Sequence, residues 1–368
     1  MSIAACGEVN AYFWSGKRVF LTGHTGFKGG WLTVWLSSMG AKVIGFSLPP
    51  STNPSLFEIA RVDALCEKSY IKDIRNLDEL CNAMQSAKPD IVIHMAAQPL
   101  VRYSYINPVE TYSTNLMGTV HVLEAIRICN SVKAVVVVTT DKCYENKEWV
   151  WGYREDEPMG GHDPYSNSKG CAELAVASYR QSFFSESKYA EHGVAIASAR
   201  AGNVIGGGDW SADRLVPDAI AAFEFGRALK LRNPSSIRPW QHVLEPLSGY
   251  LVLAQALYEE GVTFSGAWNF GPIDTDARPV KDVIELIIDQ WGGSAAWEED
   301  DCSSPHEANF LKLDCSKARQ KLAWSSRWSL EEATAAIIQW QKVFRSNGNV
   351  RSVMHSQIDK YCNSPHAN

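Results

Sequence analysis

A tyrosine and a lysine four residues apart, in the segment Tyr165-Ser166-Asn167-Ser168-Lys169, have types and spacing that suggest chemistry. On a helix this spacing places both side chains on one face. A lysine ammonium near a phenol, helped by a bound cationic group, favours the phenolate and lowers the pKa of the phenol. Tyr165 could then accept the proton of a hydroxyl while hydride leaves the same carbon. The pattern also fits an ordinary amphipathic helix, so other motifs must decide.

A second group, Thr139-Thr140-Asp141-Lys142, directly follows the apolar segment 134–138. If that segment is a strand of a parallel sheet, its carboxyl end faces the crevice where ligands bind. A hydroxyl, a carboxylate and an amine there offer an anchor, a proton donor and a proton acceptor. Without Tyr165 and Lys169, the same residues would be interpreted as a polar turn after a strand.

A glycine-rich segment, Gly23-His24-Thr25-Gly26-Phe27-Lys28-Gly29, connects an expected strand at 18–21 to an expected helix at 31–39. Glycines at this junction let the backbone approach a pyrophosphate, whose charge the helix N-terminus stabilises. The spacing is G-x-x-G-x-x-G rather than the commoner G-x-G-x-x-G. The second strand ends in Gly45-Phe46-Ser47-Leu48, with neither a carboxylate for a ribose nor an arginine cluster for a 2′-phosphate. The motif predicts a dinucleotide, and we favour NAD over NADP.

The elements that must position these groups alternate along the first two thirds of the chain. After Arg200 the rhythm breaks at Gly206-Gly207-Gly208, and shorter, mixed elements follow. This order predicts an α/β fold: a doubly wound parallel (Rossmann) sheet with a smaller mixed α/β C-terminal substrate lobe. Strands are expected at 18–21, 42–46, 70–74, 90–95, 134–139, 194–199 and 229–232, and helices at 31–39, 77–84, 116–126, 165–185, 218–225, 246–259, 280–291 and 330–344.

The expected domain boundaries follow from the same pattern. Segments 15–203 and 240–269 are assigned to the dinucleotide-binding domain, and 204–239 and 270–345 to the substrate lobe. The tail 346–368 is polar and lacks periodicity, so it is expected to fray.

Composition excludes two classes of function. The chain has 368 residues, is 45% hydrophobic and carries a net charge of −6, which gives no electrostatic footprint for nucleic acid. Its wholly apolar runs, such as 134–138, are far too short to cross a membrane. We therefore expect neither a nucleic-acid partner nor a membrane.

The nine cysteines are odd in number and include no C-x-x-C pair, so no metal site is expected. Several lie in apolar stretches, where reduced cysteine behaves as a small hydrophobic residue, as is typical of a cytoplasmic protein. Ile3-Ala4-Ala5-Cys6 is similar to a lipoprotein cleavage box, but no basic or apolar segment precedes it and Glu8 follows. We therefore do not interpret it as a signal.

Taken in order, these motifs resemble those of the extended short-chain dehydrogenases/reductases, and within them the nucleotide-sugar 4,6-dehydratases. The resemblance covers roughly residues 15–340. Relatives that act on dTDP-glucose carry Thr-Asp-Glu where this chain has Thr140-Asp141-Lys142, a difference that points to the CDP-sugar branch. The motifs are the glycine segment, His94-Met95-Ala96-Ala97-Gln98, Thr140-Asp141-Lys142, Tyr165 with Lys169, Arg200-Ala201-Gly202-Asn203-Val204, Gly207-Gly208-Asp209-Trp210 and Arg238-Pro239-Trp240-Gln241-His242-Val243.

The resemblance implies a hydro-lyase that converts CDP-glucose to CDP-4-keto-6-deoxyglucose with NAD. Hydride leaves carbon 4 while Tyr165, aided by Thr140 and paired with Lys169, accepts the hydroxyl proton. Asp141 would then protonate the leaving group at carbon 6, Lys142 stands where relatives place the base for carbon 5, and hydride returns to carbon 6. Lys142 can be that base only if neutral, which requires a pKa well below its usual value of about 10.4.

The same resemblance implies the binding residues. Asn203 could equally cap the following loop, and Arg214 could be a surface charge. His94 is expected to be a hydrogen-bonded core histidine. The substrate residues are Asn203, Arg214, Arg238 and His306, and the cofactor residues are Gly23, Thr25, Gly26, Phe27, Lys28, Gly29, Asp73, Ile74, Ala96, Ala97 and Thr139, with Tyr165 and Lys169.

By the same kinship we expect a homodimer or tetramer, paired through helices near 116–129 and 166–184. The expected pathway supplies deoxysugars for a surface polysaccharide such as lipopolysaccharide O-antigen. Three alternatives are weaker. A 4-epimerase on this scaffold has no use for Asp141 and Lys142, and a non-catalytic dinucleotide-binding regulator has no use for Tyr165 and Lys169. A reductase of free small molecules would not need a substrate lobe carrying Arg238.

Overall fold

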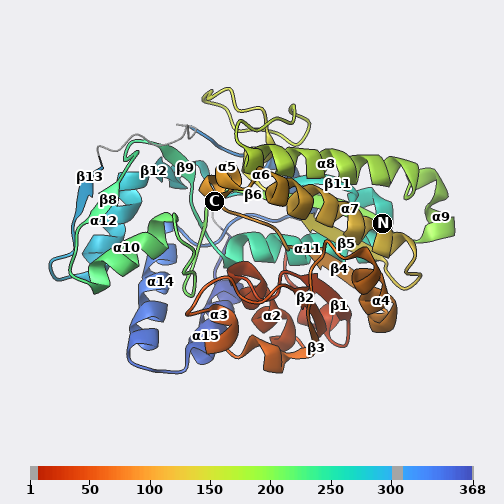
Figure 1. Cartoon of the computed structure of the whole chain (residues 1–368), viewed down its shortest axis with the longest axis horizontal. Coiled ribbons are helices and arrows are strands. Elements are labelled where there is room, and N and C mark those ends of the chain that lie inside the picture. Colours follow the sequence, from red (N-terminus) through yellow and green to blue (C-terminus); the bar gives the residue numbers. More distant parts are fainter. Residues whose placement is uncertain (1–6, 301–309, 367–368) are drawn as a thin grey trace.

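The computed structural model describes residues 7–300 and 310–366. Seven parallel strands form one twisted sheet in the order β11-β6-β5-β4-β1-β2-β3 (Figure 1). The order reverses between β1 and β4, which is where doubly wound sheets open a crevice at the carboxyl ends of their strands. The expected doubly wound fold is confirmed. The strands are β1 (Arg18–Thr22), β2 (Lys42–Ser47), β3 (Cys66–Ile71), β4 (Ile91–His94), β5 (Ala134–Val138), β6 (Ala195–Ala201) and β11 (Gly266–Phe270).

Helices cover both faces of this sheet (Figure 1). Successive strand residues point to opposite faces, so Val19 and Leu21 pack into one core while Phe20, between them, packs into the other. Burial on both sides explains why the strands are continuous apolar runs. One face carries α2 (Phe27–Ser38) and α11 (Leu244–Glu260); the other carries α4 (Leu77–Ala87), α7 (Gly118–Arg127) and α8 (Pro164–Ser182).

Most expected elements are present, with shifted ends. Helix α2 begins at Phe27, four residues early, because Gly26 is its N-cap and the helix starts directly at the glycine turn. Strand β3 ends at Ile71, so 72–74 are not strand as expected. The helix expected at 116–126 begins at Pro108 and runs through α6 (Pro108–Tyr112), a π-helical turn (Ser113–Met117) and α7.

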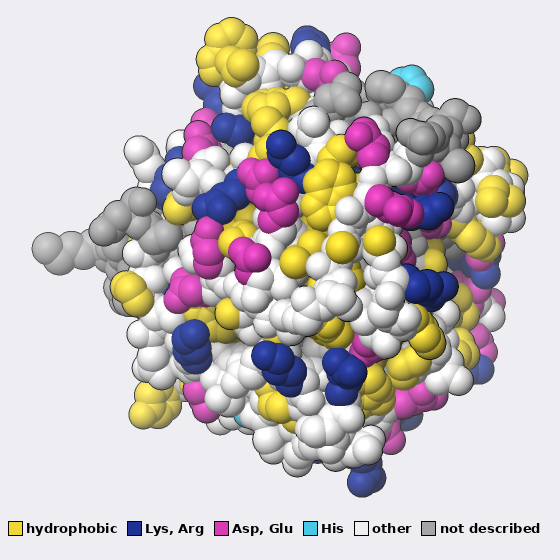
Figure 2. All heavy atoms as spheres, turned by 90° about the vertical axis from the view of Figure 1, so that its left-hand side faces the viewer, with side chains coloured by type: hydrophobic (Ala, Val, Ile, Leu, Met, Phe, Trp, Pro, Cys, Tyr) yellow, Lys and Arg dark blue, Asp and Glu magenta, His cyan; other side chains and the backbone are white. Residues whose placement is uncertain are grey.

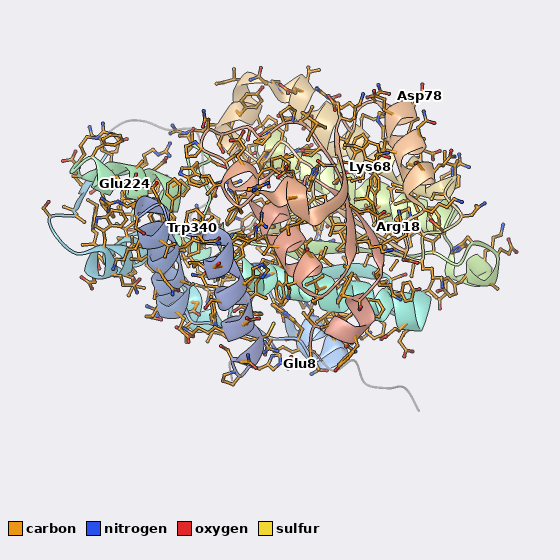
Figure 3. The ribbon with its side chains drawn as sticks, turned by 90° about the horizontal axis from the view of Figure 1, so that it is seen from below. Glu8, Arg18, Lys68, Asp78, Glu224 and Trp340 are labelled. Atoms are coloured by element: carbon orange, nitrogen blue, oxygen red, sulfur yellow. The ribbon has the colours of Figure 1, made fainter. Side chains whose placement is uncertain are left out.

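A smaller apolar cluster lies beside the sheet domain, on the left of Figure 1. Its elements pair in short sheets, parallel for β8 with β13 and antiparallel for β9 with β12, as expected of a mixed lobe. Helix α14 connects the two cores, because Ile337 packs in the small cluster and Trp340, labelled in Figure 3, packs in the large one. The exact domain boundaries stay a prediction. The elements are α10 (Leu215–Glu224), β8 (Leu229–Leu231), β9 (Ile237–Pro239), β12 (Ala277–Pro279), α12 (Val280–Trp291), β13 (Trp297–Glu299) and α14 (Leu330–Arg345).

The surface of the side that carries this lobe is shown in Figure 2. Lysine and arginine side chains lie among aspartates and glutamates there, with apolar side chains between them.

The expectation of a frayed tail at 346–368 is wrong. Residues Val350–Asn363 form α15, capped by Asn349 and packed on α2. Its buried residues Val350, Met354, Ile358 and Tyr361 recur at helical spacing, and Tyr361 meets Trp35 of α2 edge to face. The intervening polar residues hide this narrow apolar stripe in the sequence.

The remaining elements are short connections. Within the described residues, none of the helices is long and apolar enough to cross a membrane. They are α1 (Ala11–Trp14), α3 (Leu56–Ile59), α5 (Val101–Ile106), α9 (Tyr189–His192), α13 (Ser316–Leu322), the strands β7 (Val204–Ile205) and β10 (Gln241–His242), and single 3-10 turns at Val62–Leu65, Asp141–Cys143, Glu186–Lys188, Gly261–Phe264 and Asp274–Asp276.

Candidate active site

The first turns of α8 carry Tyr165 and Lys169 into a cleft at the carboxyl edge of the sheet. Asp163 caps this helix by accepting a hydrogen bond from the Ser166 amide (3.0 Å), and Pro164 occupies its first turn. Lys169 is buried, and its Nζ donates to the carbonyl oxygen of Val138 at the end of β5 (3.3 Å). The lysine is thereby fixed between its own helix and the neighbouring strand.

In the protein alone the pKa of Tyr165 is raised to about 12, so Lys169 by itself does not lower it. Burial raises this pKa most, and the negative charge of Asp141 raises it further. A hydrogen bond with Thr140 and the charge of Arg214 act in the opposite direction but are outweighed. The phenol therefore needs a further positive charge beside it to give up its proton near neutral pH.

Two ammonium groups of the cleft, the buried Lys169 and the half-buried Lys28, have lowered pKa values. Burial brings the pKa of Lys169 to about 8, opposed by Glu173. The pKa of Lys28 falls to about 7, first through desolvation and then through the charges of Lys169 and Arg214. Lys28 Nζ lies 3.2 Å from the Tyr250 hydroxyl. The cleft thus brings two amino groups together, and the one with the lower pKa, Lys28, is only partly protonated at neutral pH.

Thr140, Asp141 and Lys142 form a 3-10 turn at the end of β5. The Thr140 hydroxyl accepts a hydrogen bond from the Lys142 amide (3.3 Å) and donates to Asp141 Oδ1 (3.0 Å). Asp141 is 2% exposed, and its Oδ2 is buried with no hydrogen-bond partner within the part of the chain described. Burial raises the pKa of Asp141 despite the opposing charges of Lys142 and Arg238. A carboxyl group that holds its proton is suited to act as a general acid.

These side chains line one cleft of about 360 Å³ between the sheet domain and the smaller cluster. The cleft contains all five expected catalytic residues and three of the four expected substrate residues. Lys142 is half-buried in its wall. The expected site residues found there are Phe27, Lys28, Ala97, Thr139, Thr140, Asp141, Lys142, Tyr165, Lys169, Asn203, Arg214 and Arg238.

The glycine turn is tightly packed between β1 and α2. Gly23 has a φ of +81°, and a Cβ there would lie 2.8 Å from the Ala96 amide nitrogen. A Cβ on Gly29 would lie 2.0 Å from the Gly23 carbonyl oxygen. The Thr25 hydroxyl donates to the Leu48 carbonyl (2.8 Å), which ties the turn to the end of β2. Gly26 caps α2 without a side chain, which leaves room for an anion at the helix N-terminus.

Some expected cofactor residues do not line this cleft: Gly23, Thr25, Gly26, Gly29, Ala96, Asp73 and Ile74. Asp73 and Ile74 follow β3, outside the residues that line the cleft. Asp73 pairs with Arg75 (2.6 Å), and Ile74 is buried where a Cβ on Gly118 would touch it. His306 lies outside the described residues, as does Cys6.

A buried ion pair beneath the catalytic turn was not anticipated from the sequence. Glu173, one turn after Lys169 on α8, accepts hydrogen bonds from the hydroxyls of Thr139 and Ser198 (2.6 Å to Ser198) and from Arg200 (2.8 Å). Arg200 also donates to the Tyr144 hydroxyl (2.7 Å). Glu173 follows the Tyr-Lys motif at i+4 from the lysine, the one signal that could have indicated it.

The mouth of the cleft holds a second unanticipated group. Arg102 of α5 pairs with Asp213 (3.2 Å), and Arg232 after β8 approaches the same carboxylate oxygen (3.7 Å). Arg214 is paired with Asp209 (2.8 Å). All of these residues line the cleft, but their separation in sequence gives no motif.

The surroundings of His94 and the arrangement of possible metal ligands bear on two of the expectations from the sequence. His94 is a hydrogen-bonded core residue, as expected: its Nδ1 lies 2.7 Å from the Thr22 hydroxyl, its Nε2 lies 3.1 Å from the Thr119 hydroxyl, and burial lowers its pKa to about 3. In residues 7–300 and 310–366, no group of three or more His, Cys, Asp or Glu side chains is arranged to hold a metal ion.

Comparisons with known proteins agree with this geometry. Residues 20–337 match the family described as GDP-mannose 4,6 dehydratase. The chain is 56% identical over 353 residues to the CDP-glucose 4,6-dehydratase of Salmonella typhimurium, covering 96% of this chain and 98% of that protein. It is 25% identical to the GDP-mannose 4,6-dehydratase of Vibrio cholerae, covering 88% and 93%.

Solved structures share the fold at low identity. A dTDP-glucose 4,6-dehydratase from Streptomyces venezuelae with NAD bound has a TM-score of 0.75 at 21% identity, covering 91% of this chain and 99% of that one. A UDP-glucuronic acid 4-epimerase from Bacillus cereus with NAD and UDP-glucuronic acid also has a TM-score of 0.75, at 22% identity and covering 89% and 99%. Because dehydratases and epimerases share this fold, the fold alone does not choose between them.

Proposed function

This chain belongs to the GDP-mannose 4,6-dehydratase family, and we propose that it is a hydro-lyase that converts CDP-glucose to CDP-4-keto-6-deoxyglucose. The observation that carries the proposal is the buried turn Thr140-Asp141-Lys142 facing Tyr165 and Lys169 in one cleft. The 56% identity to the Salmonella enzyme along nearly the whole chain supports CDP-glucose as the substrate.

The residues of the glycine turn fit NAD. Gly23 and Gly29 leave no room for a Cβ, and α2 begins where a pyrophosphate would place its charge. When bound, NAD supplies reversible hydride transfer and a positively charged ring. We assign its binding to the glycine turn with Thr25, Phe27 and Lys28, to Ala96, Ala97, Thr139, Tyr165 and Lys169, and to Asp73 and Ile74 at the adenine end.

The chain's own residues account for the proton transfers. Tyr165 accepts the proton of the hydroxyl at carbon 4, and Thr140 stabilises its oxygen through their hydrogen bond. Asp141, whose pKa burial raises, donates a proton to the hydroxyl that leaves carbon 6. Lys142 takes the proton from carbon 5, and Lys169 places its ammonium on the same helix face as Tyr165. Asn203, Arg214 and Arg238 bind the substrate's diphosphate, for which the guanidinium forks are suited; His306 is a further candidate.

The epimerase alternative needs oxidation and reduction at carbon 4 but no elimination. A buried carboxyl group with a raised pKa has no task in that reaction, so Asp141 favours the dehydratase. The discriminating experiment is mass spectrometry of products after incubation with CDP-, dTDP-, GDP- and UDP-hexoses. We expect CDP-glucose alone to lose one water, without added reductant. A product of unchanged mass but altered sugar would show an epimerase.

The Tyr165→Phe variant tests the proton acceptor directly. Removing the hydroxyl leaves the ring packed but abolishes proton transfer, so we expect kcat to fall on the order of 10²–10⁴-fold. Measured NAD binding should stay within about twofold of the parent protein. Tyr258→Phe, whose hydroxyl lies 3.4 Å from Lys133 outside the cleft, serves as the control and should keep full activity. Retained turnover in Tyr165→Phe would remove this residue from its role.

We also propose that the protein is a homo-oligomer in the cytoplasm. Large apolar side chains are exposed along the two segments expected to pair subunits, 116–129 and 166–184, and on the neighbouring α5 and α6, and a second copy of this chain would cover them. Light scattering after gel filtration should give twice or four times 40.8 kDa. The cysteines in the described residues are free thiols, as suits a reducing compartment. The exposed side chains are Ile106, Val109, Met117, Ile128, Leu174 and Phe183.

A further inference from the structure

The cleft is spanned at its mouth by one carboxylate shared between two arginines from opposite walls. Asp213 Oδ1 lies 3.2 Å from Arg102 Nη1 and 3.7 Å from Arg232 Nη2. Arg102 belongs to α5, which follows the segment that contains Ala96 and Ala97, whereas Arg232 follows β8 in the smaller cluster. Asp213 therefore connects the cofactor side of the cleft to the substrate side.

This carboxylate satisfies the two arginines incompletely. Arg102 Nε and Arg232 Nη1 are buried donors without a hydrogen-bond partner in the described chain. A buried donor left unpaired is costly, so such atoms commonly await a ligand or water. Asp213 supplies one charge and one shared oxygen, fewer acceptors than these two forks can use.

The carboxylate itself is held in place weakly. Its side chain is 43% exposed, and its backbone is in the left-handed region with a φ of +60°, which a non-glycine residue rarely adopts. It also lies near another acid, since burial and then the charge of Asp213 raise the pKa of Asp218 to about 6. An anion with more oxygens could replace such a partner at low cost.

We propose that Arg102 is a substrate-binding residue and that Asp213 occupies the position of an incoming diphosphate, holding Arg102 and Arg232 ready until the nucleotide sugar displaces it. A diphosphate offers several oxygens and more than one negative charge, so it can engage the donors that Asp213 leaves unpaired. The inference rests on the proposed function only in requiring a nucleoside diphosphate in this cleft.

The test is calorimetric titration of the NAD-loaded protein with CDP. We expect Asp213→Asn to bind CDP about two- to fivefold more tightly, because a half-exposed competing ion pair is lost. Arg102→Met should bind CDP on the order of 10- to 100-fold more weakly, because charge-assisted hydrogen bonds are lost. The double variant should bind CDP as tightly as Arg102→Met does, within about twofold, because without Arg102 the Asp213 carboxylate no longer competes with CDP for that guanidinium.

Two controls separate this effect from general changes in charge or folding. Glu67→Gln breaks the Arg18–Glu67 pair, which has similar exposure but lies at the other edge of the sheet, and should leave CDP affinity unchanged. Figure 3 shows Arg18 well away from the smaller cluster, where Glu224 is labelled. Cytidine, which lacks the diphosphate, should bind Asp213→Asn and the parent equally. Arg102→Gln provides a second variant if Arg102→Met folds poorly.

Weaker or unchanged CDP binding by Asp213→Asn would overturn the proposed displacement, and unchanged binding by Arg102→Met would remove Arg102 from the site. Failure of the proposed function has a different signature. If another nucleotide sugar proves to be dehydrated, the same shifts should appear with its nucleoside diphosphate in place of CDP.

Discussion

Two regions of the molecule bury a glutamate, and the pKa values of the two carboxyl groups are shifted in opposite directions. Glu173, beneath the catalytic turn, has a pKa below its usual value because the charge and hydrogen bonds of Arg200, with the hydroxyls of Ser198 and Thr139, outweigh burial. Glu245, at the start of α11, has a pKa raised to about 7 because burial outweighs its donors. A buried carboxylate thus stays charged where a guanidinium touches it.

The donors around Glu245 come from the end of the chain. Its oxygens accept hydrogen bonds from the amides of Arg327 (3.0 Å) and Trp328 (2.7 Å) and from the Tyr361 hydroxyl (2.7 Å). Arg327 directs its guanidinium to Glu8 and to backbone carbonyls near the end of α15. The first region therefore fixes charge at the active site, while the second joins α11 to the C-terminal helix through mostly neutral hydrogen bonds.

The largest effect on stability is expected from a substitution of Glu173, the charged member of the two buried glutamates. Glu173→Gln leaves Arg200 charged and buried without its counter-ion, which costs about 3–5 kcal/mol. For a chain of this length the melting temperature should fall by roughly 4–6 °C, since unfolding entropy is about 2.1 cal/mol/K per residue. Activity should fall as well, because the amide has one acceptor oxygen where the carboxylate has two, so either Thr139 or the pair Ser198 and Arg200 loses its acceptor. Glu67→Gln, at an exposed pair, should move the melting temperature by about 1 °C or less.

A smaller effect, visible only as pH changes, is expected at Glu245. Its pKa is about 7 in the folded protein and near 4.5 unfolded, so the folded state binds more protons between these values. Below about pH 4.5, Glu245 therefore makes its full contribution to the free energy of unfolding. This contribution declines by about 3 kcal/mol as the pH rises through 7. Glu245→Gln removes the decline, so its melting temperature relative to the parent should rise from pH 5 to 8. A constant difference across this range would contradict the raised pKa.

The smallest effect on stability is expected from a substitution of Tyr361, which donates a hydrogen bond to Glu245. Tyr361→Phe removes one of the donors that stabilise the charged form of Glu245, and its contact with the Ser248 hydroxyl (2.9 Å). We expect a loss of about 1 kcal/mol. The pH at which stability declines should also move upward, because the carboxylate loses a hydrogen bond. Thermal unfolding at several pH values measures the loss of stability and the pH at which stability declines. If that pH is the same as in the parent protein, Tyr361 acts only by packing.

Local motifs predicted which residues meet at the base of the cleft. Tyr165 with Lys169, and Thr140 with Asp141 and Lys142, are encoded within a few residues, and each group is positioned by one element whose period is visible in the sequence. The sheet could be predicted for the same reason, because strands buried on both faces are short continuous apolar runs.

Long-range pairs could not be predicted in this way. Arg200 lies 27 residues from Glu173, and Asp213 lies 111 residues from Arg102, so only the folded chain brings them together. The spacing of Tyr165 and Lys169 indicates a nearby lysine but not the desolvation of the phenol, which raises the pKa of Tyr165 in the protein alone. Helix α15 was missed because its apolar stripe is one residue wide and its remaining residues are polar.

The packing of α15 on α2 has a consequence for how the protein is made. Helix α2, which carries the glycine turn, leaves the ribosome long before α15, the helix that covers Trp35. The first βα unit must therefore wait with an uncovered apolar face until α15 has been made, and such a face on a nascent chain is prone to aggregation. Truncated chains that stop before α15 should consequently be captured by chaperones rather than fold to a working enzyme.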